Sequence, residues 1–162
     1  MTHVVVMGVT GSGKTTVGAA LARRLGVPFA DADEFHSAAN VAKMSAGVPL
    51  DDADRVPWLH AIGEWLAARD GDVVSCSALK RAYRDVLREH VPDVFFVHLH
   101  GDPETVRRRV AGRAGHFMPA SLVASQFAAL EPLGEDEHGV VLALDAPVAD
   151  LVDAAARSVR GS

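Results

Sequence analysis

The sequence predicts an α/β protein whose parallel sheet carries helices on both faces. Short β-branched apolar runs such as "HVVVMG" and "DVVSCS" alternate with stretches whose apolar residues recur at helical spacing. This alternation is typical of a parallel sheet with crossover helices. The chain has 162 residues, of which 49% are hydrophobic and 23% charged, as expected for one globular domain with its own core. We therefore expect residues 1–162 to form a single domain.

The first half of the chain alternates strands and helices. The run "HVVVMG" (3–8) is β-branched, short and ended by glycine, which is typical of a buried strand. Residues 14–25 place apolar side chains at helical spacing, and Gly26 follows as a stop. The stretch "VPFADAD" (27–33) predicts a second strand, and 37–46 a short helix. Pro57 suits the first turn of a helix over 56–69.

The second half continues the alternation with three more strands. "DVVSCS" (72–77) precedes a helix over 79–89, and "DVFFVHL" (93–99) precedes one from 102 to about 110. The glycines and proline of "GRAGHFMP" (112–119) favour a mobile segment before a helix over 121–130. "GVVLAL" (139–144) is the fifth expected strand, and 148–159 the last helix. Ligands of such sheets bind beyond the carboxyl ends of the strands, so the residues there are the candidate site.

The stretch "GVTGSGKT" after the first strand has the spacing G-x-x-x-x-G-K-[ST] of a phosphate-binding loop. Glycines let the backbone approach phosphates, and the N–H groups of the loop and of the next helix attract them. Lys14 should reach the β- and γ-phosphates and the Thr15 hydroxyl should bind Mg²⁺. A chance glycine turn is the alternative, but the strand–loop–helix context favours the phosphate loop. We expect ATP and Mg²⁺ as cofactors, with the nucleotide held by Gly8, Thr10, Gly11, Ser12, Gly13, Lys14, Thr15 and Thr16.

Two carboxylates follow the second expected strand in "ADADEFH". Asp31 and Asp33 are two residues apart, so on a strand both side chains would point to the same side. Near a γ-phosphate, one carboxylate can hold Mg²⁺ through water while the other accepts the proton of an attacking hydroxyl. The alternative is a turn with a helix cap, for which aspartate is common. Beside a phosphate loop, the functional interpretation is favoured.

Basic residues lie after the other expected strands. Lys80 and Arg84 share one face of the expected helix at i and i+4, and Arg55 precedes another helix. Each of these cations could meet an anion. The alternative is a solvated basic face. Arg109 and Arg113, with glycines beside them, predict a lid over about 109–120 that closes over ATP and brings cations to the transferring group. A flexible basic loop would look similar.

Composition narrows the function classes. A net charge of −5 argues against a general nucleic-acid partner. No apolar run approaches the roughly 20 residues that cross a bilayer, and the first apolar run is too short for a signal peptide. The single cysteine, Cys76, forms no internal disulfide and suits a reducing cytoplasm, where we expect it to be a buried small residue. We therefore expect a cytoplasmic protein with no membrane or nucleic-acid partner.

The chain resembles the gluconate kinases of the P-loop small-molecule kinases over roughly residues 4 to 137. Matching stretches include "DADEFHSAANVAKMSAGVPLDDADRVPWL", "CSALKRAYRDVLRE", "GDPETVRRRVAGRAGHFMP" and "SQFAALEPLGEDE". Where the family usually has D-G-D-x-x-H-P, this chain has Ala32 and Ser37 in place of glycine and proline, and its "LEPL" departs from the usual L-E-x-P. The resemblance implies a P-loop NTPase fold, a homodimer, and transfer of the ATP γ-phosphate to the 6-hydroxyl of D-gluconate.

The resemblance also implies roles for individual residues. Asp33 meets the attacking hydroxyl and Asp31, with Thr15, holds Mg²⁺, while one cation meets the gluconate carboxylate. The implied set is Lys14, Asp33, Arg109 and Arg113 for catalysis, Arg109 also for the nucleotide, and Asp33, His36, Arg55, Lys80, Arg84, His116 and Gln126 for the substrate.

Three other functions are compatible with parts of this pattern. A shikimate-kinase-like enzyme would share the loop and the aspartates, but it carries a glycine triplet where this chain has "CSALK". A nucleoside monophosphate kinase needs a base pocket that the sequence does not identify. A nucleotide-binding regulator would bind ATP without acceptor-dependent turnover.

Overall fold

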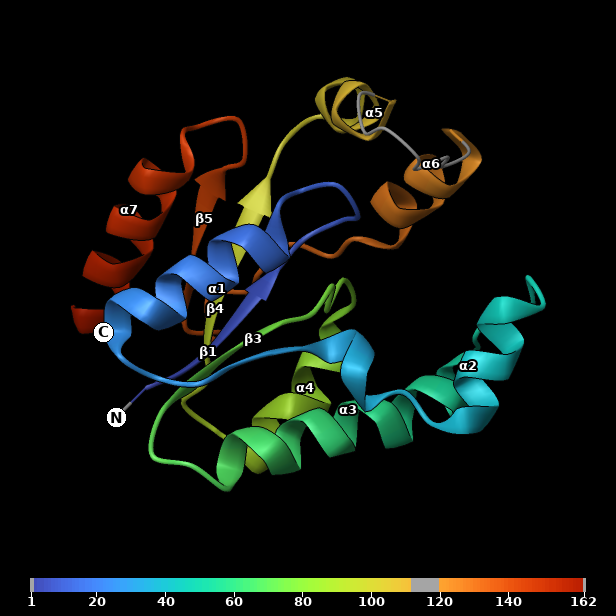
Figure 1. The fold of residues 1–162 in the computed structure, drawn as a ribbon, viewed down its shortest axis with the longest axis horizontal. Coiled ribbons are helices and arrows are strands. Elements are labelled where there is room, and N and C mark those ends of the chain that lie inside the picture. The colour runs from blue at the N-terminus through green and yellow to red at the C-terminus, as the bar shows by residue number, and fades with distance from the viewer. Residues whose placement is uncertain (1, 112–119, 162) are drawn as a thin grey trace.

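A computed structural model describes residues 2–111 and 120–161 of the protein. Its five strands form one parallel sheet in the order β2-β3-β1-β4-β5. The elements are β1 (His3–Met7), α1 (Lys14–Leu25), β2 (Phe29–Asp31), the 3-10 helix η1 (Ala32–Phe35), α2 (Ala38–Ser45), α3 (Asp52–Ala67), β3 (Asp72–Ser75), α4 (Arg81–His90), β4 (Phe95–His100), α5 (Pro103–Ala111), α6 (Ala120–Ala129), β5 (Gly139–Ala143) and α7 (Val148–Arg160). Figure 1 labels all of them except β2 and η1.

Helices cover both faces of the sheet, so the central strand β1 is buried on both sides. Val4 and Val6 pack in a core that includes side chains of α1 and α7. Val5 and Met7 point the other way, into a core with side chains of α3 and α4. Figure 1 shows these helix pairs on opposite sides of the strands. Burial on both faces explains the unbroken apolar run that begins the sequence.

The predicted fold class is confirmed, and the differences lie at element boundaries. β2 ends at Asp31, and residues 32–35 form η1, so the expected strand over 27–33 is shorter. α3 begins at Asp52 because Asp51 and Asp54 form a capping box, which places Pro57 inside the helix instead of in its first turn. α4 begins at Arg81, so Lys80 is its N-cap and does not share a helical face with Arg84.

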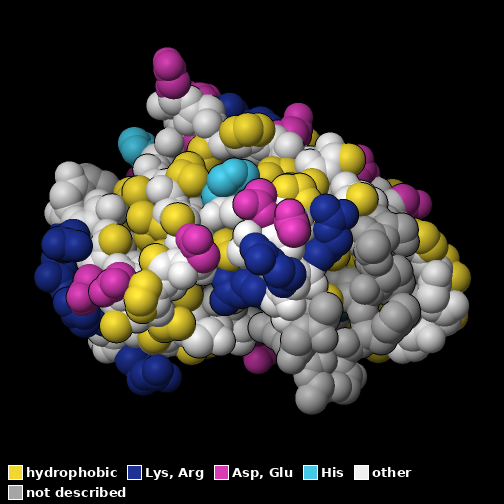
Figure 2. All heavy atoms as spheres, turned by 90° about the horizontal axis from the view of Figure 1, so that it is seen from above, with side chains coloured by type: hydrophobic (Ala, Val, Ile, Leu, Met, Phe, Trp, Pro, Cys, Tyr) yellow, Lys and Arg dark blue, Asp and Glu magenta, His cyan; other side chains and the backbone are white. Residues whose placement is uncertain are grey.

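The surface mixes charges of both signs. On the face shown in Figure 2, the described Lys and Arg side chains lie in small groups beside Asp and Glu side chains. Among the described helices, none combines the length and apolar character needed to cross a membrane. Most of the predicted lid, including residues 112–119, lies outside the described residues.

Candidate active site

The loop between β1 and α1 brings its backbone close to neighbouring groups. Gly11 has a φ of +78°, and a Cβ there would lie 2.6 Å from Val110 Cγ2. Gly13, with a φ of +92°, is the N-cap residue of α1. Both positions favour glycine because side chains rarely adopt this left-handed backbone. The helix that follows presents its first N–H groups at the loop, where a phosphate would be stabilised.

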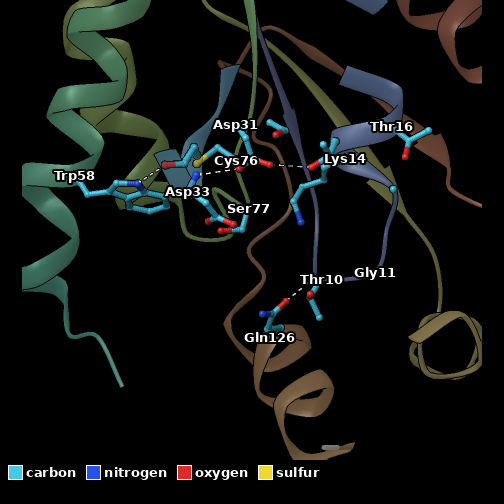
Figure 3. Close-up of a pocket in the computed structure, with 14 residues that line it drawn as sticks. Thr10, Gly11, Lys14, Thr16, Asp31, Asp33, Trp58, Cys76, Ser77 and Gln126 are labelled. Atoms are coloured by element: carbon cyan, nitrogen blue, oxygen red, sulfur yellow. Dashed lines mark hydrogen bonds between the residues drawn. The ribbon is translucent and has the colours of Figure 1, made fainter. Parts of the chain in front are cut away.

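Lys14 and Thr15 begin α1 beside the end of β2. Lys14 Nζ donates to the carbonyl oxygen of Val9 at 3.1 Å, which folds the side chain over the loop. Thr15 Oγ1 donates to Asp31 Oδ2 at 3.0 Å (Figure 3). The two residues expected to serve Mg²⁺ are therefore in direct contact.

The two aspartates lie together, but the expected period-two geometry is wrong because Asp33 belongs to η1 and not to the strand. Asp31 Oδ1 accepts the backbone N–H of Asp33 at 2.9 Å, so Asp31 caps η1. The Asp33 side chain is 88% exposed. Asp31 thus combines the helix-cap role with its contact to Thr15, while the Asp33 carboxylate stays open to an incoming group.

The phosphate loop and both aspartates line one cavity of about 360 Å³. Most of its wall comes from the loop, from α1 and from the ends of β2 and β3 (Figure 3). The full lining is Thr10, Gly11, Gly13, Lys14, Thr15, Thr16, Asp31, Ala32, Asp33, Trp58, Ser75, Cys76, Ser77 and Gln126. Gly8 and Ser12, which the motif also predicts to hold the nucleotide, belong to the loop but do not line this cavity, and Ser12 is buried.

Trp58 also lines the cavity, although no sequence motif marks it as a site residue. Its Nε1 donates to the carbonyl oxygen of Ala32 at 2.7 Å, between the two aspartates. His36 stacks on its ring, with centroids 4.4 Å apart and planes 9° apart. The His36 side chain is 6% exposed and does not line the cavity, so direct substrate contact by this ring does not fit this structure. The pKa of His36 is lowered, and burial of the ring is the main cause.

Two predicted cations, Arg55 and Lys80, share the ring of Tyr83. Arg55 Cζ and Lys80 Nζ lie 5.7 and 5.6 Å from the ring centroid. The Tyr83 hydroxyl donates to Asp52 Oδ1 at 2.7 Å and accepts from Arg55 Nη1 at 3.4 Å. Burial, followed by the hydrogen bond to Asp52, raises the pKa of Tyr83 and keeps its proton in place. Neither cation lines the cavity itself.

The expectation that Arg84 contacts the substrate is wrong in this structure, because its side chain is fully buried. Its Nε and Nη2 donate to the Glu137 carboxylate at 2.7 and 3.2 Å. The remaining N–H groups of the guanidinium donate to the carbonyl oxygens of Ala78, Leu79 and Pro132. All five guanidinium N–H groups are therefore used within the protein. Ala78 has a φ of +45°, so this arginine also holds a strained turn after β3.

Gln126 and Arg109 lie against the phosphate loop. Gln126 Oε1 accepts the N–H of Thr10 at 2.6 Å (Figure 3). Arg109 Nη1 donates to the carbonyl oxygen of Leu144 at 2.9 Å, and a Cβ on Gly13 would lie 3.6 Å from its Nη2. Arg113 and His116, predicted for catalysis and for the substrate, lie outside the described residues.

The residues near Thr15 and Asp31 fit a magnesium ion. Mg²⁺ prefers oxygen ligands and usually binds through one or two carboxylates, with waters and substrate phosphates completing its shell. The Ser75 hydroxyl lines the same cavity and is buried without a hydrogen-bond partner within the described part of the chain. Ser75 pairs in register with Asp31 across β2 and β3. A magnesium-bound water would satisfy this hydroxyl.

Cys76 lines the cavity without taking part in its chemistry. Burial raises the pKa of its thiol to about 12. The thiol therefore stays protonated and unreactive at neutral pH. This agrees with the expectation of a buried small residue.

A parallel sheet with a phosphate loop and an open carboxylate beside it is typical of P-loop kinases that act on small molecules. The family model described as shikimate kinase matches residues 10–126. Solved structures of a shikimate kinase from Bacteroides thetaiotaomicron and of a Mycobacterium tuberculosis APS kinase share the fold, with TM-scores of 0.67 and 0.69 at 19% and 18% identity.

Three gluconokinases are much more similar to this chain in sequence. A gluconokinase of Gluconobacter oxydans is 51% identical over 138 residues, which cover 83% of this chain and 78% of that protein. The thermosensitive gluconokinase of Escherichia coli is 45% identical over 141 residues, covering 85% and 75%. The crystal structure of a Sinorhizobium meliloti gluconokinase has a TM-score of 0.91 at 47% identity, covering 99% of this chain and 92% of that one. The chain belongs to the gluconokinase family.

Proposed function

We propose that this protein transfers the γ-phosphate of ATP to the 6-hydroxyl of D-gluconate, giving ADP and 6-phosphogluconate. The proposal is supported by family membership together with one observation, the exposed Asp33 carboxylate in the same cavity as Lys14 and the phosphate loop. A phosphate held by the loop and a hydroxyl held by this carboxylate would meet within that cavity.

Each group in the cavity has a task in this reaction. The loop N–H groups and Lys14 would hold the β- and γ-phosphates, and Thr15 and Asp31 would hold Mg²⁺, which when bound neutralises phosphate charge. Asp33 would orient the 6-hydroxyl and accept its proton as the oxygen bonds to the γ-phosphorus and the bond to ADP breaks. Because the transition state is loose, we expect orientation of the hydroxyl to contribute more than basicity.

Cations outside the cavity complete the proposed site. Arg55 and Lys80, held on Tyr83, would meet the gluconate carboxylate at the far end of the substrate. Arg109 lies beside the loop, where with Arg113 it would neutralise the charge of the transferring group. Gln126 would exchange its bond to Thr10 N–H for contacts with the bound ligands.

Release of ADP from Mg-ATP tests the proposal, with D-gluconate, shikimate, a nucleoside monophosphate or no acceptor. We expect turnover with gluconate alone. Asp33→Asn should lower kcat at least a hundredfold while ATP still binds, since the amide does not orient the hydroxyl as the carboxylate does and cannot accept its proton. Asp70→Asn, at an exposed aspartate after α3, is the matched control and should leave kcat unchanged. Equal rates with and without gluconate would contradict the proposal and favour a nucleotide-binding regulator.

We also propose that the protein is a cytoplasmic homodimer, a state that the resemblance to gluconate kinases supports. Sedimentation equilibrium of the purified protein measures the mass directly. A mass near 34 kDa, twice the 17.1 kDa of the chain, is expected, and a mass of one chain would contradict the dimer.

A further inference from the structure

The His36 ring lies between Asp33 and Asn40. Its Nε2 is 4.0 Å from Asp33 Oδ1, and its Nδ1 is 3.3 Å from Asn40 Nδ2. One face of the ring is stacked on Trp58. The ring therefore has one nitrogen toward the carboxylate of the proposed site and the other toward a buried amide.

The orientation of the Asn40 amide follows from its second contact. Asn40 Nδ2 also lies 3.1 Å from the carbonyl oxygen of Asp54, and a carbonyl oxygen only accepts hydrogen bonds. The atom at that position is therefore the NH₂ group, which has a second hydrogen for His36 Nδ1. Nδ1 must then accept, so the neutral ring carries its proton on Nε2, facing Asp33.

The surroundings hold this arrangement in place. Asn40 is 4% exposed, and its backbone N–H donates to the Ser37 cap of α2 at 3.1 Å. Asp54, which supplies the carbonyl oxygen, belongs to the capping box of α3. The bond from Trp58 to Ala32 fixes the backbone directly before Asp33. Burial is the main cause that lowers the pKa of His36, and it favours the neutral ring. The negative charge of Asp33 raises this pKa, and the positive charge of Arg55 lowers it further.

We propose that His36 is a positioning residue whose Nε2–H holds the Asp33 carboxylate in the orientation that receives the substrate hydroxyl, with Asn40 selecting the tautomer. This inference rests on the proposed function. At 4.0 Å the hydrogen bond is not formed in this structure, and it requires the Asp33 side chain, which is 88% exposed, to turn toward Nε2. Without the ring, an exposed carboxylate would sample several rotamers, and the reacting hydroxyl would lose its alignment.

Three substitutions separate positioning from packing. In His36→Gln the amide nitrogen reaches the place of Nε2, whereas in His36→Asn it reaches only that of Nδ1, and His36→Phe keeps the stacking alone. We expect His36→Gln to retain kcat within about threefold. His36→Asn and His36→Phe should lose about tenfold in kcat, with the KM values for ATP and gluconate within about twofold of wild type. Equal kcat values for His36→Gln and His36→Asn would overturn the inference.

The tautomer can be measured without any turnover. In ¹⁵N-histidine-labelled protein, NMR distinguishes protonated from unprotonated ring nitrogens, and the His36 signals are identified by their loss in His36→Gln, since the chain has eight histidines. We expect a neutral ring protonated on Nε2, and a proton on Nδ1 would overturn the inference. A wild-type protein without gluconate-dependent turnover would instead contradict the proposed function, and the tautomer would still report whether Asn40 orients the ring.

Discussion

Arg84 and Arg55 are two arginines with similar sequence contexts and very different surroundings. Both are candidates from the sequence for the cation that meets the gluconate carboxylate, and both lie in or near the first turn of a helix. Arg84 is fully buried, with Glu137 and three carbonyl oxygens around it. The Arg55 side chain is 33% exposed, lies over Tyr83 and is 3.8 Å from the exposed Asp52. The difference shows that burial and partners, more than residue type, decide whether a cation is available to a ligand.

The largest effect is expected at Arg84. Arg84→Ala leaves Glu137 buried without its partner, which should lower the free energy of unfolding by about 3–5 kcal/mol. Urea unfolding followed by circular dichroism measures this change. Arg24→Ala is the matched control because Arg24 also pairs with an aspartate, Asp153, at 2.6 Å but with both side chains about half exposed (45% and 49%). That variant should lose no more than about 1 kcal/mol. Similar losses in the two variants would show that burial does not distinguish the pairs.

A change at Arg55 should affect substrate binding and leave stability nearly unchanged. Arg55→Gln removes the charge while keeping a polar side chain of similar length. Hydrogen bonds to charged groups contribute about 1.5–3 kcal/mol, so the KM for gluconate should rise roughly 10- to 100-fold. Steady-state kinetics at saturating ATP provide the measurement, with Arg24→Gln as the control. An unchanged KM would remove Arg55 from the proposed carboxylate site.

The smallest effect is expected at Tyr83, which holds Arg55 in place. Tyr83→Phe keeps the ring beneath the two cations but removes the hydroxyl that bonds Asp52 and Arg55. Both hydrogen bonds are partly exposed, so their loss should raise the KM for gluconate only about two- to fivefold with kcat unchanged. Steady-state kinetics at saturating ATP measure this KM, which is compared with the KM of Arg55→Gln. A larger increase in KM than that of Arg55→Gln would mean that Tyr83 itself contacts the substrate.

Much of the fold could be predicted because its signals are local. The expected helix over 14–25 agrees with α1, and all five strands were placed within a few residues. The misplaced boundaries depend on contacts that spacing does not show. The capping box of Asp51 and Asp54 moved the start of α3, and the bond from Asp33 N–H to Asp31 replaced the end of a strand by a 3-10 turn.

The candidate site could be located from the sequence where its residues lie close together along the chain, and not where they come from distant elements. The phosphate loop is continuous in sequence, so its pattern identified Lys14 and Thr15 at once. Trp58 was missed because its position on α3 looks like core packing, and only the folded chain brings its Nε1 to Ala32. The surroundings of Arg84 depend on Glu137, and those of His36 depend on Asn40. The sequence pattern around Arg84 and His36 does not indicate these partners.

The sequence alone therefore determined the α/β class, the phosphate loop and the resemblance to gluconate kinases, because periodicity and motif spacing are properties of the unfolded chain. The tertiary structure decided which charged and aromatic side chains face the cavity. Arg84 meets Glu137 across 53 positions, and Trp58 meets Ala32 across 26. Such pairs form only when the sheet and its helices pack, and the burial that packing imposes decides whether a charged group is available for binding or used to hold the fold together.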